Sequence, residues 1–138
     1  MTQVLSLNLQ RSHLRQHLSV NNMTKLYHAT ISNRVDSILK EGLLIDSGYK
    51  NYNYSNECIC LTDNAAVAEA FVSNANNITD DDVENESIVV LSIDLDCLEN
   101  RYLFEDTNIV ADAGDIRYFE YRKNIPPEAI QEEYAISF

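Results

Sequence analysis

Two residues in this chain could do chemistry together, a histidine and a glutamate that lie far apart in the sequence. His28 is part of KLYHAT, where an expected strand ends and Thr30 approaches a helix start. A histidine there can be a core residue, a metal ligand or a group that holds a substrate through its ring nitrogens. Glu120 lies in IRYFEYR, and strand alternation puts it on one face with Tyr118 and Arg122. It can meet a substrate or form an ordinary Glu–Arg pair.

The three cysteines, Cys58, Cys60 and Cys97, favour free thiols in a reducing compartment. An odd number excludes a complete disulfide framework. A zinc site is disfavoured, because Cys-x-Cys is not the usual ligand spacing and no paired histidines follow. We therefore expect no metal.

The net charge of −12 is spread unevenly along the 138 residues. Residues 1–35 contain four bases and no acid, whereas residues 36–138 contain 22 acids and 6 bases, a balance of −16. A body this acidic repels nucleic-acid phosphates, so nucleic acid is disfavoured as a partner. The charge can serve solubility alone or can mimic a nucleic acid. No apolar run is long enough to span a bilayer, and we expect no membrane partner.

Local patterns predict the elements that would position these residues. A helix is expected over 33–41, capped by Ser32 or Asn33 and ended by Gly42. Strands are expected at 58–62, 88–95, 116–122 and near 134–138, and the β-branched run 88–95 should be central in a sheet. A second helix, AAVAEAFVSNA, should follow a cap at Asp63 or Asn64, with Val67, Ala70 and Phe71 facing inward. Three segments are expected to be loops: 46–56 with Tyr49, Tyr52 and Tyr54, the acidic and mobile 76–87, and 106–115.

This order of elements predicts an α+β class with a mixed or antiparallel sheet in a single domain over residues 23–138. Residues 1–22 differ from the rest, with leucines on one helical face, two arginines and no acids. They can be an organelle transit peptide, an amphipathic helix docked on the domain, or an upstream extension before a start at Met23.

In its order of motifs, the chain resembles the ADP-ribosyltransferase superfamily, on the side of the poly-ADP-ribose polymerases and small bacterial or phage transferases. The motifs are LYHAT, ILKEGLL, ICLTDNAAVAEAF and YFEYRKNIPPEAI, and the resemblance covers residues 24–130. The resemblance implies a split β core of two small sheets with short flanking helices. It also implies NAD as co-substrate, with the nicotinamide in a cleft.

The resemblance assigns roles to particular positions. His28 matches the histidine that holds a ribose of NAD, followed by Ala29 and Thr30, and Glu120 matches the late-strand glutamate beside the same ribose. Cys60 and Phe71 match the tyrosine on the next strand and the helix aromatic that stacks on nicotinamide. Because Cys60 cannot stack as a tyrosine does, Phe71 or a loop tyrosine such as Tyr54 would supply the aromatic wall. His28 and Glu120 should then face one cleft near Phe71 and the tyrosine loop.

The implied reaction breaks the bond between nicotinamide and ribose, which builds positive charge on the sugar as glycoside cleavage does. Glu120 would stabilise that charge, fix the ribose 2′-hydroxyl and help orient the acceptor. His28 would position the ribose by hydrogen bonding.

The expected function is mono-ADP-ribosylation of a macromolecule by a monomeric protein, cytoplasmic or delivered into the cytoplasm of a target cell. A protein acceptor is favoured because the surface is acidic, and a toxin, an effector or a phage anti-defence protein would fit. Two alternatives stay open: a non-catalytic acidic binding or inhibitor protein on the same scaffold, and an enzyme related to RNA 2′-phosphotransferases. The latter chemistry needs several basic residues in the cleft, and bases are few here.

Overall fold

The computed structural model describes residues 23–46, 58–75, 78–106 and 116–138. These residues form one antiparallel sheet of six strands with a few short helices, which confirms the α+β class. The strand order is β4-β5-β2-β1-β3-β6. The strands are β1 (Lys25–Ile31), β2 (Ile59–Thr62), β3 (Ser87–Asp94), β4 (Leu103–Glu105), β5 (Tyr118–Tyr121) and β6 (Ile130–Ser137). The α-helices are α2 (Val35–Glu41), α3 (Ala65–Ser73) and α4 (Asp80–Asn85), and short 3-10 turns are η1 (Ser32–Arg34), η2 (Leu95–Cys97), η3 (Asn100–Tyr102) and η4 (Pro127–Ala129).

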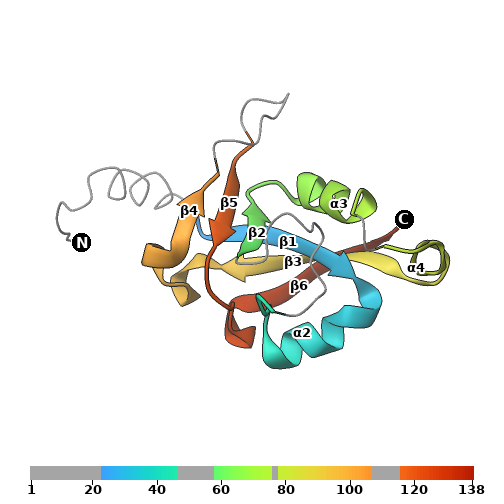
Figure 1. Ribbon diagram of the computed structural model, residues 1–138, viewed down its shortest axis with the longest axis horizontal. Helices are drawn as coiled ribbons and strands as arrows, with labels where there is room; N and C mark the ends of the chain where they lie inside the picture. The colour runs from blue at the N-terminus through green and yellow to red at the C-terminus, as the bar shows by residue number, and fades with distance from the viewer. Residues whose placement is uncertain (1–22, 47–57, 76–77, 107–115) are drawn as a thin grey trace.

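The sheet has two halves, β4-β5-β2 and β1-β3-β6, which meet between β1 and β2. Among the described residues β1 and β2 pair only at Tyr27 and Thr62, whereas β1 pairs with β3 at every position from Lys25 to Ile31. Figure 1 shows β4 and β5 running steeply across the direction of β1 and β3. The predicted pair of small sheets is thus corrected to one sheet, because the Tyr27–Thr62 pair joins the halves.

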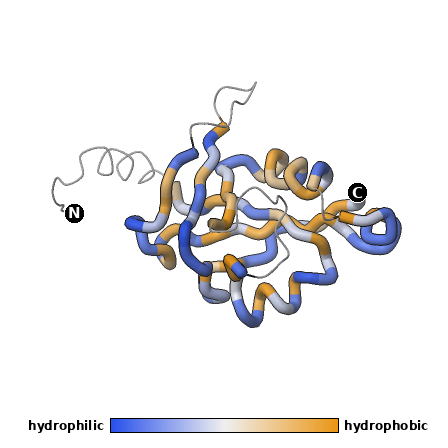
Figure 2. The backbone as a smooth tube through the Cα atoms, in the orientation of Figure 1, coloured by the Kyte–Doolittle hydropathy of each residue, from blue (hydrophilic) through white to orange (hydrophobic). Residues whose placement is uncertain are grey.

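Each face of the sheet carries its own hydrophobic cluster. Strand alternation sends one set of side chains toward α2 and the other toward α3. The larger cluster includes Leu26, Ile38, Leu91 and Phe119, and the smaller one joins Ala29, Ile31, Ile88 and Val90 of the sheet to Ala68 and Val72 of α3. Figure 2 shows hydrophobic segments along the central strands and a hydrophilic segment at α4. The predicted central strand 88–95 is confirmed, because β3 lies between β1 and β6 with its interior residues buried.

Helix α2 ends as the sequence predicts, but it begins differently. Gly42 has a φ of +92°, and its N–H donates to the Ile38 carbonyl over 2.7 Å. A Cβ at this position would lie 2.2 Å from the carbonyl oxygen of Ile125, so only glycine fits. The predicted cap is not formed; instead the Ser32 hydroxyl donates to Glu86 and accepts from the Ser87 N–H, which ties η1 to the start of β3.

Two helical predictions around α3 and α4 need correction. Asn64 caps α3 as expected, accepting from the Val67 N–H, but the buried residues are Ala68 and Val72 rather than the predicted set. The small Ala68 side chain lets the helix lie close to the sheet, and Ala70 is exposed. The predicted loop 76–87 contains α4, begun by a capping box in which Thr79 and Asp82 bond each other's backbone N–H groups. Residues 1–22 lie outside the described residues.

Candidate functional site

The structure brings three of the predicted site residues onto three adjacent strands. His28 lies on β1, Cys60 on β2 and Glu120 on β5. The His28 Nδ1 atom is 2.9 Å from the Cys60 carbonyl oxygen, and Cys60 lies directly opposite Glu120 in the β2–β5 register. Residues from distant parts of the chain therefore meet around β2.

His28 lies at the line along which β1 and β2 separate, which we call the seam. If the register at Tyr27 and Thr62 continued, Ala29 would lie opposite Cys60. The imidazole of His28 bonds the carbonyl of this same Cys60. At the seam, a polar side chain therefore ties β1 to β2 beside the Tyr27–Thr62 pair.

The ionisation of His28 follows from this position. Burial lowers the pKa of the ring below its ordinary value of 6.5, and the hydrogen bond to the Cys60 carbonyl opposes that shift. The ring is therefore neutral at pH 7. Because a carbonyl only accepts, Nδ1 carries the proton and donates, which leaves the lone pair on Nε2. His28 can accept a hydrogen bond from a ligand hydroxyl at Nε2.

A cavity of about 190 Å³ opens beside His28 on the α2 face. Its polar lining comes from β1, η1 and α2, and its apolar lining comes from α2 and the turn after it. The lining residues are His28, Thr30, Arg34, Ser37, Ile38, Glu41, Gly42, Leu43 and Leu44. Thr30 and Arg34 are buried, at 3% and 8% exposure. A pocket of this mixed character suits a small ligand with hydroxyl groups and one apolar surface.

Sequence reasoning did not pick out Arg34, Ser37 and Glu41 as lining residues. They stand at i, i+3 and i+7, a spacing that places them on one side of a helix. This polar stripe was the available signal. The sequence prediction left out these three residues because the family motifs lie mainly on the strands.

Four other predicted residues, Ala29, Cys60, Phe71 and Glu120, lie on the other face of the sheet. Alternation along β1, β2 and β5 directs Ala29, Cys60 and Glu120 toward the α3 side, since Ile59, Leu61, Phe119 and Tyr121 belong to the α2-side cluster. Phe71 of α3 stacks on Tyr118, with ring centroids 5.8 Å apart and planes 28° from parallel. His28 and Glu120 therefore leave the sheet on opposite faces with the Cys60 peptide between them. The expectation that both residues face one cleft is wrong, because strand alternation separates them.

Glu120 is half-buried and forms a Glu–Arg ion pair, which the sequence allowed as an alternative to contact with a substrate. Arg122 Nε and Nη2 both donate to Glu120 Oε1, over 3.2 and 3.1 Å. Tyr54, the other predicted binding residue, lies outside the described residues, as do Tyr49 and Tyr52. Cys58, Cys60 and Cys97 are free thiols, buried, half-buried and exposed in turn.

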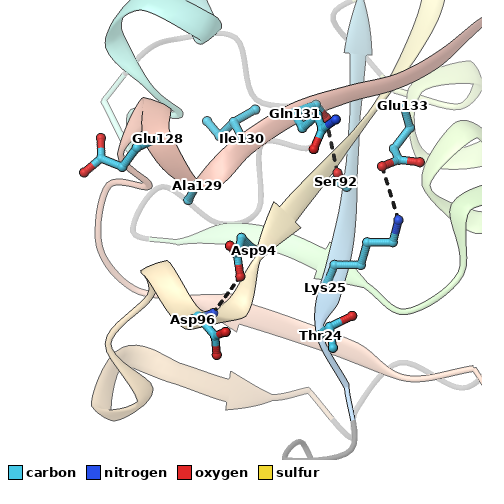
Figure 3. A pocket seen from close by; sticks show the side chains of 10 residues that line it. All are labelled: Thr24, Lys25, Ser92, Asp94, Asp96, Glu128, Ala129, Ile130, Gln131 and Glu133. Atoms are coloured by element: carbon cyan, nitrogen blue, oxygen red, sulfur yellow. Dashed lines mark hydrogen bonds and ion pairs between the residues drawn. The ribbon is translucent and has the colours of Figure 1, made fainter.

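A second, larger cavity of about 550 Å³ lies at the start of β1, where β3 ends and β6 begins (Figure 3). Four carboxylates line it, from Asp94, Asp96, Glu128 and Glu133, and Lys25 pairs with Glu133 over 3.2 Å. No residue of the predicted site lines this cavity. Across the described ranges, no three His, Cys, Asp or Glu side chains are grouped so that they could hold a metal ion.

No family model matches the chain, and no curated protein matches its sequence. In the part of the chain that the structure describes, no helix has the length and apolar character needed to cross a membrane.

Proposed function

We propose that this protein is an NAD-dependent mono-ADP-ribosyltransferase that modifies a protein acceptor. The observation that carries the proposal is the meeting of His28, Cys60 and Glu120 on three adjacent strands around the seam. The seam offers a neutral imidazole beside a small cavity on one side and a carboxylate on the other. These are the groups needed to hold a ribose and to stabilise positive charge on it.

The reaction follows glycoside chemistry. The bond between ribose C1′ and the nicotinamide nitrogen breaks, and its electron pair leaves with nicotinamide. An acceptor nucleophile then forms a bond to C1′ and gives up its proton. A carboxylate near the sugar stabilises the cationic transition state, which is the role we assign to Glu120. His28 Nε2 would accept a hydrogen bond from a ribose hydroxyl and so fix the sugar.

The acceptor is proposed to be a protein because the body of the chain is strongly acidic. The balance of −16 over residues 36–138 disfavours a phosphate-rich acceptor and favours a basic protein surface. The proposed setting is the cytoplasm of the cell that makes the protein or of a target cell.

The test compares the wild-type protein with Glu120→Gln in the presence of NAD and a cell lysate. We expect nicotinamide release and acceptor labelling to fall by about 100-fold or more, since the variant loses a carboxylate that acts on the transition state. Glu132→Gln is the matched control, because it removes the same charge from exposed β6. Equal rates for the wild type and Glu120→Gln, with both proteins folded, would overturn the catalytic role.

One observation favours a second candidate, an acidic binding protein on the same scaffold. Cys60 stands where the resemblance expects an aromatic wall, and the acidic body could bind a basic partner without any turnover. Salt-sensitive binding to such a partner, unchanged by Glu120→Gln and by removal of NAD, would support this candidate over catalysis.

A further inference from the structure

Glu120 is part of a three-residue arrangement on the outer half of the sheet. Arg122 is two residues further along, and both its Nε and Nη2 donate to Oε1 of Glu120. The guanidinium carbon of Arg122 lies 4.0 Å from the centre of the Phe104 ring. Phe104 belongs to β4 and stands directly opposite Glu120 in the β4–β5 register. The ring therefore supports the guanidinium, and the guanidinium holds the carboxylate.

This arrangement treats the two oxygens of the carboxylate differently. Oε1 accepts both hydrogen bonds from Arg122, whereas Oε2 has no hydrogen-bond partner among the residues that the structure describes. A guanidinium is planar and presents its donors in a fixed fork, so it limits rotation of the carboxylate. Oε2 is left to meet a ligand hydroxyl in one orientation.

A similar group elsewhere in the protein shows what an ordinary surface pair looks like. Arg101 donates from Nη2 to Glu99 Oε1 over 3.2 Å and lies 4.9 Å from the centre of the Tyr102 ring. Its side chain is 71% exposed, against 53% for Arg122, and Glu99 is also shared with Lys123. Arg122 makes two bonds to one oxygen, lies closer to its ring and acts on a half-buried carboxylate. The same residue types therefore give a tighter group at Glu120.

We propose that Arg122, supported by Phe104, is the positioning residue of Glu120. The inference rests on the proposed function and deepens it. An exposed ion pair adds little to folding stability, so the value of this pair lies in the orientation of the carboxylate. Small misplacement of a catalytic group lowers the rate of the chemical step more than it weakens ligand binding.

The test measures nicotinamide release by Arg122→Ala, Arg122→Lys and Phe104→Leu, with Arg101→Ala as the matched control. We expect Arg122→Ala to lower kcat by about 10- to 100-fold while KM for NAD changes by less than about 3-fold. Arg122→Lys should recover only part of the rate, because an ammonium group cannot reproduce the fork. Phe104→Leu should cause a smaller loss of kcat, and Arg101→Ala none.

Chemical rescue separates positioning from general damage to the fold. Guanidinium ion, at concentrations well below those that denature, should restore part of the activity of Arg122→Ala and none of Glu120→Gln. Wild-type kcat in Arg122→Ala, or an equal loss in Arg101→Ala, would overturn the inference while Glu120 kept its role. Wild-type activity in Glu120→Gln would overturn the proposed function and this inference together.

Discussion

The two edges of β1 are built in opposite ways. On one edge β1 pairs with β3 at every position from Lys25 to Ile31, and on the other it pairs with β2 at Tyr27 alone among the described residues. The first edge, which we call the ladder, is paired with β3, a strand whose interior residues are buried. The second is the seam, where the His28 ring bonds the Cys60 carbonyl. Pairing with β3 holds β1 in the sheet along its whole length. The edge beside β2 carries the polar contact between His28 and Cys60.

The sequence explains the difference. Strand β3 has the residues SIVVLSID, and its run Ile88–Ile93 is buried throughout, so it packs on both faces of the sheet. Strand β2 has only four residues, and its Cys60 is half-buried. Strand β2 therefore offers β1 a shorter and less apolar neighbour than β3 does. The continuous pairing and the proposed site therefore lie on different edges of one strand.

The largest expected effect breaks the ladder. Leu91 lies opposite His28 in the β1–β3 register and is fully buried in the α2-side cluster. Leu91→Ala should lower the free energy of unfolding by about 3 kcal/mol, through lost burial and a residual cavity, in urea denaturation. Ile136→Ala on β6, where the side chain is 37% exposed, should cost less than about 1 kcal/mol. Equal losses for the two variants would show that the ladder does not carry the stability.

A smaller effect is expected where α2 is anchored beside the seam. Gly42 lines the cavity next to His28, and a Cβ there would meet the Ile125 carbonyl at a positive φ. Gly42→Ala should lower the free energy of unfolding by about 2 kcal/mol, from backbone strain and the forced displacement of Ile125. Ser37→Ala, an exposed change on the same helix, should change it by less than about 0.5 kcal/mol. Urea denaturation of both variants measures the difference, and a Gly42→Ala protein as stable as Ser37→Ala would contradict it.

Strand β3 of the ladder and the end of α2 were predictable from sequence because their signals are local. The β-branched run gave β3, and Gly42 gave the end of α2. Helix α4 was missed although Thr79 and Asp82 have the spacing of a capping box, because the acidic composition suggested a solvated loop. The inward face of α3 was wrong because the contact depends on how closely Ala68 approaches the sheet.

The seam was harder to predict, because its geometry depends on register between distant strands. The motif residues His28, Cys60 and Glu120 could be chosen by resemblance, and their strands are adjacent. No local pattern states that Tyr27 of β1 pairs with Thr62 of β2, or that the His28 ring bonds a backbone carbonyl. Nor could the support of Arg122 by Phe104 be expected, because it requires β4 to lie beside β5.

The smallest expected effect tests the seam by its pH dependence. Burial lowers the pKa of folded His28 below the unfolded value of 6.5, so below that pH the unfolded chain binds more protons than the folded one. The wild type should therefore lose stability as pH falls through about 6.5 toward the folded pKa.

His28→Gln can keep a donor to the Cys60 carbonyl without titrating, so it should lack this part of the loss. Urea denaturation between about pH 7.5 and pH 5 measures the stability difference, and the histidines at 13 and 17 are common to both proteins. We expect the difference to shift in favour of His28→Gln as pH falls, whereas parallel curves would mean that the His28 ring titrates as freely in the folded protein as in the unfolded chain.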